Sequence, residues 1–180
     1  MSRAFVNEDL QSEAQAELPE RPQSDHPNYV TPQGLAALER RLANLLAERS
    51  ELTDDADEMR HEAVRRRIDR NARYLRARID RAILVSPDAQ PRGEVAFGAR
   101  VRVCDADGEE RSFAIVGEDE ADAGVGKVSW VSPLSNALLG ARIGDVVIWR
   151  RPNGNVELEI LSIDYAPPAA APLPGGDSGT

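Results

Sequence analysis

Cysteine and histidine are almost absent from this chain of 180 residues, which has one cysteine and two histidines. The single Cys104 cannot form a disulfide within the chain, and it cannot supply a cysteine-based zinc site. His26 and His61 are too few for a histidine cluster or for a catalytic arrangement that pairs a nucleophile with a histidine base. We therefore predict that the chain has no catalytic or metal centre of its own and is not an enzyme.

Long apolar runs are also missing. No stretch reaches the ~18 apolar residues that a membrane-spanning helix needs, so we predict no membrane segment. The first residues are acidic and lack the apolar core of a signal peptide, which predicts a cytoplasmic protein. Aromatic residues make up 4% of the chain, too few for the aromatic-lined pocket that a prolyl isomerase activity would need.

Basic residues are in the minority overall, with a formal net charge of −9, but they are unevenly distributed. Residues 1–29 carry a net charge of −4, residues 30–86 carry +2, and residues 87–180 carry −7. The phosphate backbone would repel most of such a surface, which argues against a stand-alone DNA-binding protein. The balance fits a protein that docks on another protein.

The middle of the chain carries two helical patterns. Thr31 followed by Pro32 predicts a helix start, with a hydroxyl at the N-cap and proline at the first helical position. Leucines at three-four spacing then predict a helix of about twenty residues with an apolar seam, and Arg49 occupies the one polar seam position. A second seam runs through His61, Val64, Ile68, Ala72, Leu75, Ile79 and Ala82.

A short polar link between two such helices predicts an antiparallel hairpin over residues 29–86. The link holds Thr53 and Asp57, either of which could cap the second helix. Residues 1–28 are acidic and poor in aliphatic side chains, and residues 167–180 are rich in proline, alanine and glycine. We predict that both end segments are disordered, with a short extended stretch near Pro27.

Beyond the hairpin the apolar period changes to two, which predicts a β domain over residues 93–166. Five short antiparallel strands are expected, and a short helix is expected from Pro133 to Leu139, ahead of Gly140. The class is therefore α+β. The alternating positions are Val95, Phe97, Val101, Val103, Phe113, Ile115, Val128, Trp130, Val147, Trp149, Val156, Leu158 and Ile160.

Two stretches carry a family resemblance, namely Tyr29-Val-Thr-Pro-Gln-Gly34 and Val131-Ser-Pro-Leu-Ser-Asn-Ala-Leu-Leu-Gly-Ala-Arg-Ile-Gly-Asp-Val-Val147. Together with the arginine-rich hairpin they resemble the GreA/GreB family of bacterial transcription elongation factors, over residues 29–165. The resemblance implies an FKBP-like β domain and a monomer that binds bacterial RNA polymerase. The coiled coil would enter the secondary channel of the polymerase, with indirect contact to DNA and RNA.

One family motif is missing. Cleavage factors of the family carry Gly-Asp-x-Ser-Glu-Asn at the hairpin tip, and this sequence has no such motif. Against the family pattern each arm is also about two turns short, which removes ~10 Å of reach at ~1.5 Å per residue. Catalytic positioning does not tolerate such an error. We therefore predict a regulator of elongation that does not stimulate transcript cleavage; the alternatives are a cleavage factor, or a coiled-coil adaptor for a different partner.

Acidic residues at the tip form the first candidate site. They are Asp54, Asp55, Asp57 and Glu58. Carboxylates are suitable ligands for Mg²⁺, and in the family the tip lies beside the catalytic magnesium of the polymerase. The predicted cofactor set is therefore empty, apart from a magnesium ion shared at the polymerase active site. The alternative is a solvated turn that caps the second helix.

Two further candidate surfaces are predicted. Arginines on the second helix could contact nucleic acid or the channel wall, and the alternative is a solvated face paired with nearby acids. Those singled out are Arg65, Arg66, Arg70 and Arg73. In the β domain, the resemblance places polymerase docking at Ser132, Pro133 and Leu134, with Leu134 as an apolar anchor. The alternative there is that these residues only start a short helix and pack against the core.

Overall fold

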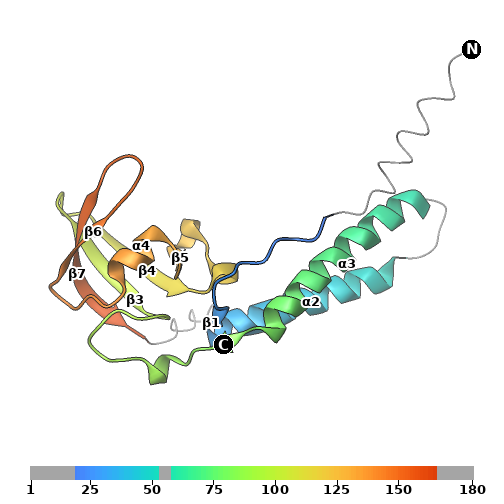
Figure 1. Ribbon diagram of the computed structural model, residues 1–180, viewed down its shortest axis with the longest axis horizontal. Coiled ribbons are helices and arrows are strands. Elements are labelled where there is room, and N and C mark those ends of the chain that lie inside the picture. The colour runs from blue at the N-terminus through green and yellow to red at the C-terminus, as the bar shows by residue number, and fades with distance from the viewer. Residues whose placement is uncertain (1–18, 53–57, 166–180) are drawn as a thin grey trace, which may run out of the picture. The chain divides into compact units, whose positions relative to one another are not determined.

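The computed structural model describes residues 19–52 and 58–165, and the chain divides into two compact units, 1–84 and 85–180. Figure 1 labels the elements of both units. Our predictions for residues 1–18, for Asp54, Asp55 and Asp57, and for the tail 167–180 lie outside the described residues. Among the described residues, no helix is long and apolar enough to cross a membrane.

The first long helix begins where the sequence predicts. Helix α2 spans Pro32–Glu51, and the N-cap residue Thr31 accepts a hydrogen bond from the backbone N–H of Gly34 at 2.9 Å. Proline occupies the first turn, where its missing N–H leaves no helical bond unmade. The predicted cap and the predicted length of about twenty residues are both confirmed.

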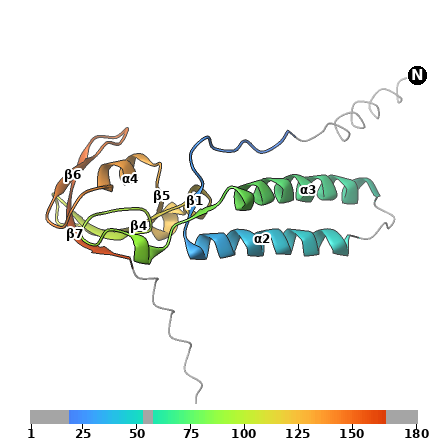
Figure 2. The same cartoon turned by 60° about the horizontal axis from the view of Figure 1, so that its bottom comes forward.

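Helix α3 spans Glu58–Asp80 and runs antiparallel beside α2, as Figure 2 shows. Its seam residues Ile68, Ala72 and Leu75 are each 1% exposed, and Leu38 of α2 is 2% exposed. Leu38 and Leu75 form a buried cluster with Val30, and Leu35, Leu42 and Leu45 of α2 pack against it. The two seams therefore face each other within one chain.

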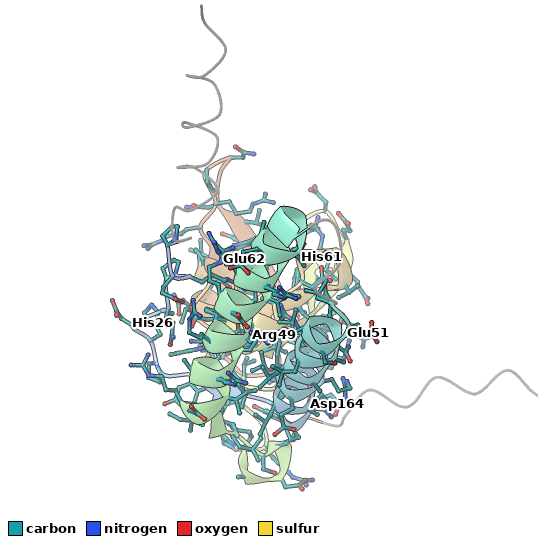
Figure 3. All side chains as sticks on the ribbon, turned by 90° about the vertical axis from the view of Figure 1, so that its right-hand side faces the viewer. His26, Arg49, Glu51, His61, Glu62 and Asp164 are labelled. Atoms are coloured by element: carbon teal, nitrogen blue, oxygen red, sulfur yellow. The ribbon has the colours of Figure 1, made fainter. Side chains whose placement is uncertain are left out.

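Arg49, the polar seam residue of α2, pairs across the hairpin with Asp69 of α3. Its Nε lies 2.5 Å from Oδ1 of Asp69, and a terminal guanidinium nitrogen lies 3.3 Å from Oδ2. Figure 3 labels Arg49 where the two helices meet. The hydrogen bond to the carboxylate raises the pKa of Arg49 above its usual value. The pair extends the seam toward the tip with a polar contact in place of a leucine.

The base of the hairpin is closed by a small parallel sheet that the sequence analysis did not anticipate. Strand β1, Tyr29–Val30, precedes both helices in the sequence, and it pairs with strand β2, Ile83–Leu84, which follows them. Beside it, Nδ2 of Asn28 donates to the backbone carbonyl of Arg78 at 2.6 Å. Asn28 is 5% exposed and Val30 is 1% exposed, so the chain is firmly packed as it enters the hairpin.

Residues 19–28, which we call the N-terminal strap, correct one prediction. We expected disorder over residues 1–28 with a short extended stretch near Pro27, yet residues 20–28 have defined contacts with α3 and with Arg81 just beyond it. Composition misled the prediction because it counts only apolar burial. The strap is held by ion pairs, by hydrogen bonds and by one aromatic ring, none of which needs an aliphatic side chain.

The second unit contains a five-stranded sheet in the order β5-β4-β3-β7-β6. Its strands are β3 at Arg100–Asp105, β4 at Glu110–Val116, β5 at Lys127–Ser129, β6 at Val146–Trp149 and β7 at Val156–Asp164. A short helix, α4, spans Pro133–Leu138. The α+β class is confirmed, with a helical hairpin followed by a small FKBP-like β domain with one short helix.

The sheet is mixed rather than wholly antiparallel, because β5 runs parallel to β4. Residues 117–126 carry the chain back through two short 3-10 turns, so that Lys127 lies beside Ala114. Period-two alternation shows that a segment is a strand but not which way it runs. Three predicted strand positions also fall just outside the strands: Val95 and Phe97 precede β3, and Trp130 follows β5.

The core of this unit lies between the sheet and α4. Val101, Val103, Ile115, Leu138 and Ile160 are fully buried there. Leu138 comes from α4, and the other four are inward positions of the predicted alternation, so the face that these strands bury follows the sequence pattern.

The two ends of the β unit are joined through one side chain. The hydroxyl of Tyr165 donates to the carbonyl of Glu94 at 2.5 Å and accepts from the N–H of Ala96 at 2.8 Å. Burial raises the pKa of Tyr165 above its usual value.

Replacing Leu38 tests the hairpin seam. We expect Leu38→Ala to lower the free energy of unfolding of the hairpin by about 2–5 kcal/mol, because it opens a cavity at a site that is 2% exposed. Leu46→Ala is the matched control: this leucine of the same helix is 37% exposed and should cost less than about 1 kcal/mol. Urea unfolding followed by far-UV circular dichroism measures both, and equal losses would contradict the seam.

Candidate functional site

The acidic tip is only partly within the described residues. Glu58 is the first residue of α3, and α2 ends at Glu51, so residues 52–57 connect the helices. The remaining residues of the predicted acidic site, Asp54, Asp55 and Asp57, lie outside the described residues. Carboxylates at this position also suit the positive end of the α3 dipole, so both the capping role and the metal-proximal role remain predictions.

The predicted arginine surface on α3 is largely engaged within the chain. Arg65 donates to the carbonyl of Leu52 at 3.3 Å, at the end of α2. Arg66 pairs with Glu62, one turn away on the same helix, at 2.9 Å. These contacts agree with the solvated, paired face that was the alternative for this helix.

Arg70 and Arg73 differ from each other. The Nε atom of Arg70 is buried without a hydrogen-bond partner among the described residues. Arg73 donates from Nε and from a terminal nitrogen to Oε1 of Glu20, at 2.8 and 2.6 Å. Glu20 is more than fifty residues away in sequence, and no sequence signal pointed to it. The predicted site residues thus share one helix but have unlike surroundings.

The predicted docking loop in the β unit is the start of α4. Ser132 is the N-cap, and its hydroxyl accepts from the backbone N–H of Ser135 at 3.2 Å. The buried hydroxyl of Ser135 in turn donates to the carbonyl of Ser129 at 2.7 Å. Pro133 follows at the first helical position and is exposed. The loop is therefore rigid, and Pro133 is open to a partner.

Leu134 does not have the position that an apolar anchor requires. Its side chain is 4% exposed and belongs to the core of the β unit, beside Leu138. The helical turn that leaves Pro133 on the surface rotates the next residue inward. The structure thus removes Leu134 from the exposed docking candidates, while Ser132 and Pro133 remain predictions.

A surface that the sequence analysis missed lies next to Pro133. A shallow cavity of about 330 Å³ is lined by Pro133, Asn136, Ala137, Ile148 and Arg150. Ile148 belongs to β6, the edge strand of the sheet, and is 52% exposed. The sequence feature that could have revealed Ile148 is its place between Val147 and Trp149. Successive side chains of a strand point to opposite faces, so Ile148 points outward if its two neighbours point inward.

Metal ligation finds no support in the described parts of the chain. Over residues 19–52 and 58–165, no group of three or more histidine, cysteine, aspartate or glutamate side chains is placed to hold an ion. The tip carboxylates Asp54, Asp55 and Asp57 are not within those ranges.

The cap at Ser132 gives a direct test of how the docking loop is held. We expect Ser132→Ala to lower the free energy of unfolding of the β unit by about 1 kcal/mol, because the N–H of Ser135 loses its acceptor. Ser132→Thr keeps the hydroxyl and should retain most of that stability. Tryptophan fluorescence during urea unfolding reports on this unit, since Trp130 and Trp149 both lie in it. Equal stability of the alanine and threonine variants would contradict the cap.

Comparison with known proteins identifies the family. The C-terminal family model for GreA/GreB transcription elongation factors matches residues 90–165. Transcription elongation factor GreB of Neisseria meningitidis serogroup A is 37% identical over 153 residues, which cover 77% of this chain and 94% of the relative. GreA of Thermodesulfovibrio yellowstonii is 42% identical over 92 residues, covering 51% of this chain and 58% of the relative.

A crystal structure of GreA factor homolog 1 (Gfh1) of Thermus thermophilus is also similar, with 28% identity and a TM-score of 0.37. It covers 77% of this chain and 99% of that one. The match to GreB extends beyond the β unit, because it spans more than three quarters of the present sequence. The chain belongs to the GreA/GreB family of transcription elongation factors.

Proposed function

We propose that this chain binds bacterial RNA polymerase in the cytoplasm and regulates elongation through the secondary channel, without stimulating transcript cleavage. The observation that carries the proposal is a paired helical hairpin with a tip that lacks the cleavage motif. The hairpin has the slender form that insertion into a channel needs, with α2 and α3 packed along one seam (Figure 2). The tip has carboxylates but not the family's Gly-Asp-x-Ser-Glu-Asn sequence.

The bounds of the two helices support the absence of cleavage. Helix α2 ends at Glu51 and α3 begins at Glu58, so residues 52–57 must make the whole connection. Such a short connection cannot extend the reach of arms that are about two turns shorter than the family pattern. A carboxylate displaced by ~10 Å cannot orient a metal-bound water for attack on a phosphate. Any magnesium near the tip would therefore be the polymerase's own, and the chain would have no resident cofactor.

Docking of the β unit is proposed at the surface around Pro133 and Ile148. Both residues line the same shallow cavity, and Ile148 provides the exposed apolar side chain that Leu134 cannot. An aliphatic anchor beside a rigid proline suits a protein partner, because little conformational entropy is lost on binding. The acidic charge of residues 87–180 opposes direct binding of nucleic acid by this unit.

Transcript cleavage is the first test. We expect the purified protein to compete with a cleavage-competent family member for polymerase, and not to shorten the RNA of backtracked complexes. Replacing Asp54, Asp55 and Asp57 together with alanine should change the effect on elongation while affinity stays within about twofold, since the tip would act near the active site rather than in docking.

Three other outcomes would contradict this proposal. Magnesium-dependent cleavage that the triple variant abolishes would make the protein a cleavage factor. A triple variant identical to the wild type in every elongation assay would reduce the tip to a solvated turn. Failure to bind polymerase at all would favour an adaptor for another partner.

The docking surface is tested at Ile148. We expect Ile148→Lys to weaken binding to polymerase about tenfold or more, because it replaces an apolar anchor with a charge that must be desolvated. The strand should tolerate lysine, since Glu157 is the neighbour of Ile148 across the β6–β7 pair. Val125→Lys is the matched control, because Val125 is 68% exposed and lies in a short 3-10 turn of the same unit. If both variants lose affinity equally, charge and not the anchor is responsible.

A further inference from the structure

The N-terminal strap follows α3 on the flank that faces away from α2. Figures 1 and 2 show this arrangement from two directions, with the strap, α3 and α2 lying in that order. In Figure 3, His26 marks the strap on the same side of α3. One flank of α3 is therefore covered by the partner helix, and another is covered by residues that precede the hairpin in sequence.

Within the described part of the chain, three contacts of residues 20–23 hold the strap against α3 and the residue that follows it. The carboxylate of Glu20 accepts two hydrogen bonds from Arg73, and the guanidinium of Arg21 lies 4.0 Å from the centre of the Tyr74 ring. The side-chain carbonyl of Gln23 accepts from Arg81 at 3.0 Å. The surface that receives these side chains, which we call the flank site, consists of Arg73 and Tyr74 of α3 and of Arg81, which directly follows the last residue of the helix.

The spacing of these contacts matches an extended chain laid along a helix. From Arg73 to Asp80, the last residue of α3, the helix advances by ~10 Å at ~1.5 Å per residue, and Arg81 follows directly. From Glu20 to Gln23 an extended chain spans ~10 Å at ~3.3 Å per residue. The remaining difference is within the reach of an arginine side chain. The flank site thus accepts an extended peptide that presents oxygen acceptors about three residues apart.

Within residues 19–28, the two ends of the strap differ in burial. At its C-terminal end, Asn28 is 5% exposed and bonds to the carbonyl of Arg78. At the other end the ion pair is open to solvent, with side-chain exposures of 55% for Arg73 and 61% for Glu20. Exposed ion pairs and exposed cation–π contacts are individually weak, because water and salt screen them. Residues 19–23 can therefore detach while the base of the hairpin stays packed.

We propose that the flank site is a binding surface for an acidic polypeptide segment of the polymerase, and that the N-terminal strap occupies it in competition with that segment. The proposal rests on the proposed function, since it assumes that the hairpin meets polymerase. The bound strap shows the chemistry that the site accepts: a carboxylate on Arg73, an amide oxygen on Arg81 and a cation over Tyr74. A protein segment supplies all three, whereas nucleic acid supplies no cation for the ring.

Competition within the chain lowers the apparent affinity in proportion to the fraction of molecules whose strap is bound. The double variant Glu20→Ala/Gln23→Ala removes two of the three contacts and leaves the flank site intact. We expect it to bind polymerase about three to ten times more tightly than the wild type, measured by fluorescence anisotropy of labelled full-length protein. Tenfold corresponds to ~1.4 kcal/mol, which is of the size expected for a few exposed polar contacts.

Two matched variants separate competition from simpler effects. Glu39→Ala removes one acidic charge from the exposed surface of α2 and should leave the affinity unchanged. Arg73→Ala also releases the strap but removes part of the flank site, so its affinity should fall below that of the double variant. Helix melting by circular dichroism should change little in all of these variants, because the seam residues are untouched.

Several results would overturn the proposal. If the wild type binds polymerase and the double variant binds equally or more weakly, the strap does not compete. A lower melting temperature without tighter binding would assign the strap a purely structural role. Tighter binding of the double variant to a single-stranded RNA oligomer but not to polymerase would assign the site to nucleic acid. No binding of the wild type to polymerase would instead contradict the proposed function on which this inference rests.

Discussion

A single narrow apolar seam holds the hairpin, and the positions of its charged groups follow from that constraint. Most residues of helix α3 are polar or charged, and its apolar residues Ile68, Ala72 and Leu75 are almost fully buried. All its other faces must carry polar side chains, which here are mostly arginines. A helix with so little apolar surface gains stability only through its partner. The seam therefore fixes which arginines face α2, which face the strap and which face solvent.

The arginines of α3 have acceptors on different segments of the chain, so residues of the same type differ in what they hold together. Arg66 pairs along its own helix, Arg65 reaches the end of α2, and Arg73 pairs with the N-terminal strap. On the other helix, Arg49 reaches across the seam to Asp69. Each pair is exposed enough to contribute little stability by itself. Such pairs orient segments and can be exchanged for contacts with a partner, which suits a surface that docks.

At the candidate docking surface, the sequence pattern predicted the start of the helix but not which side chains are exposed. The Ser132-Pro133 pair correctly indicated a capped helix start, because hydroxyl N-caps and a first-turn proline act through local backbone geometry. The same local reasoning failed for Leu134, which turned into the core, and it overlooked Ile148 on β6. Both outcomes depend on how α4 packs against the sheet. Residues 133 and 148 meet at one cavity only because that packing exists.

The sequence by itself determined the two hairpin helices, the starts of α2 and α4, and the inward residues of the main strands, because these depend on periodicity and on backbone chemistry within a few residues. It also determined the missing tip motif and the family resemblance. Tertiary structure alone decided that β5 runs parallel to β4, that β1 pairs with β2, and that residues 19–28 lie along α3. These features join residues that are distant in sequence through backbone hydrogen bonds and polar side chains. Contacts of that kind leave no periodic pattern in the sequence, so only the folded chain shows which partners meet.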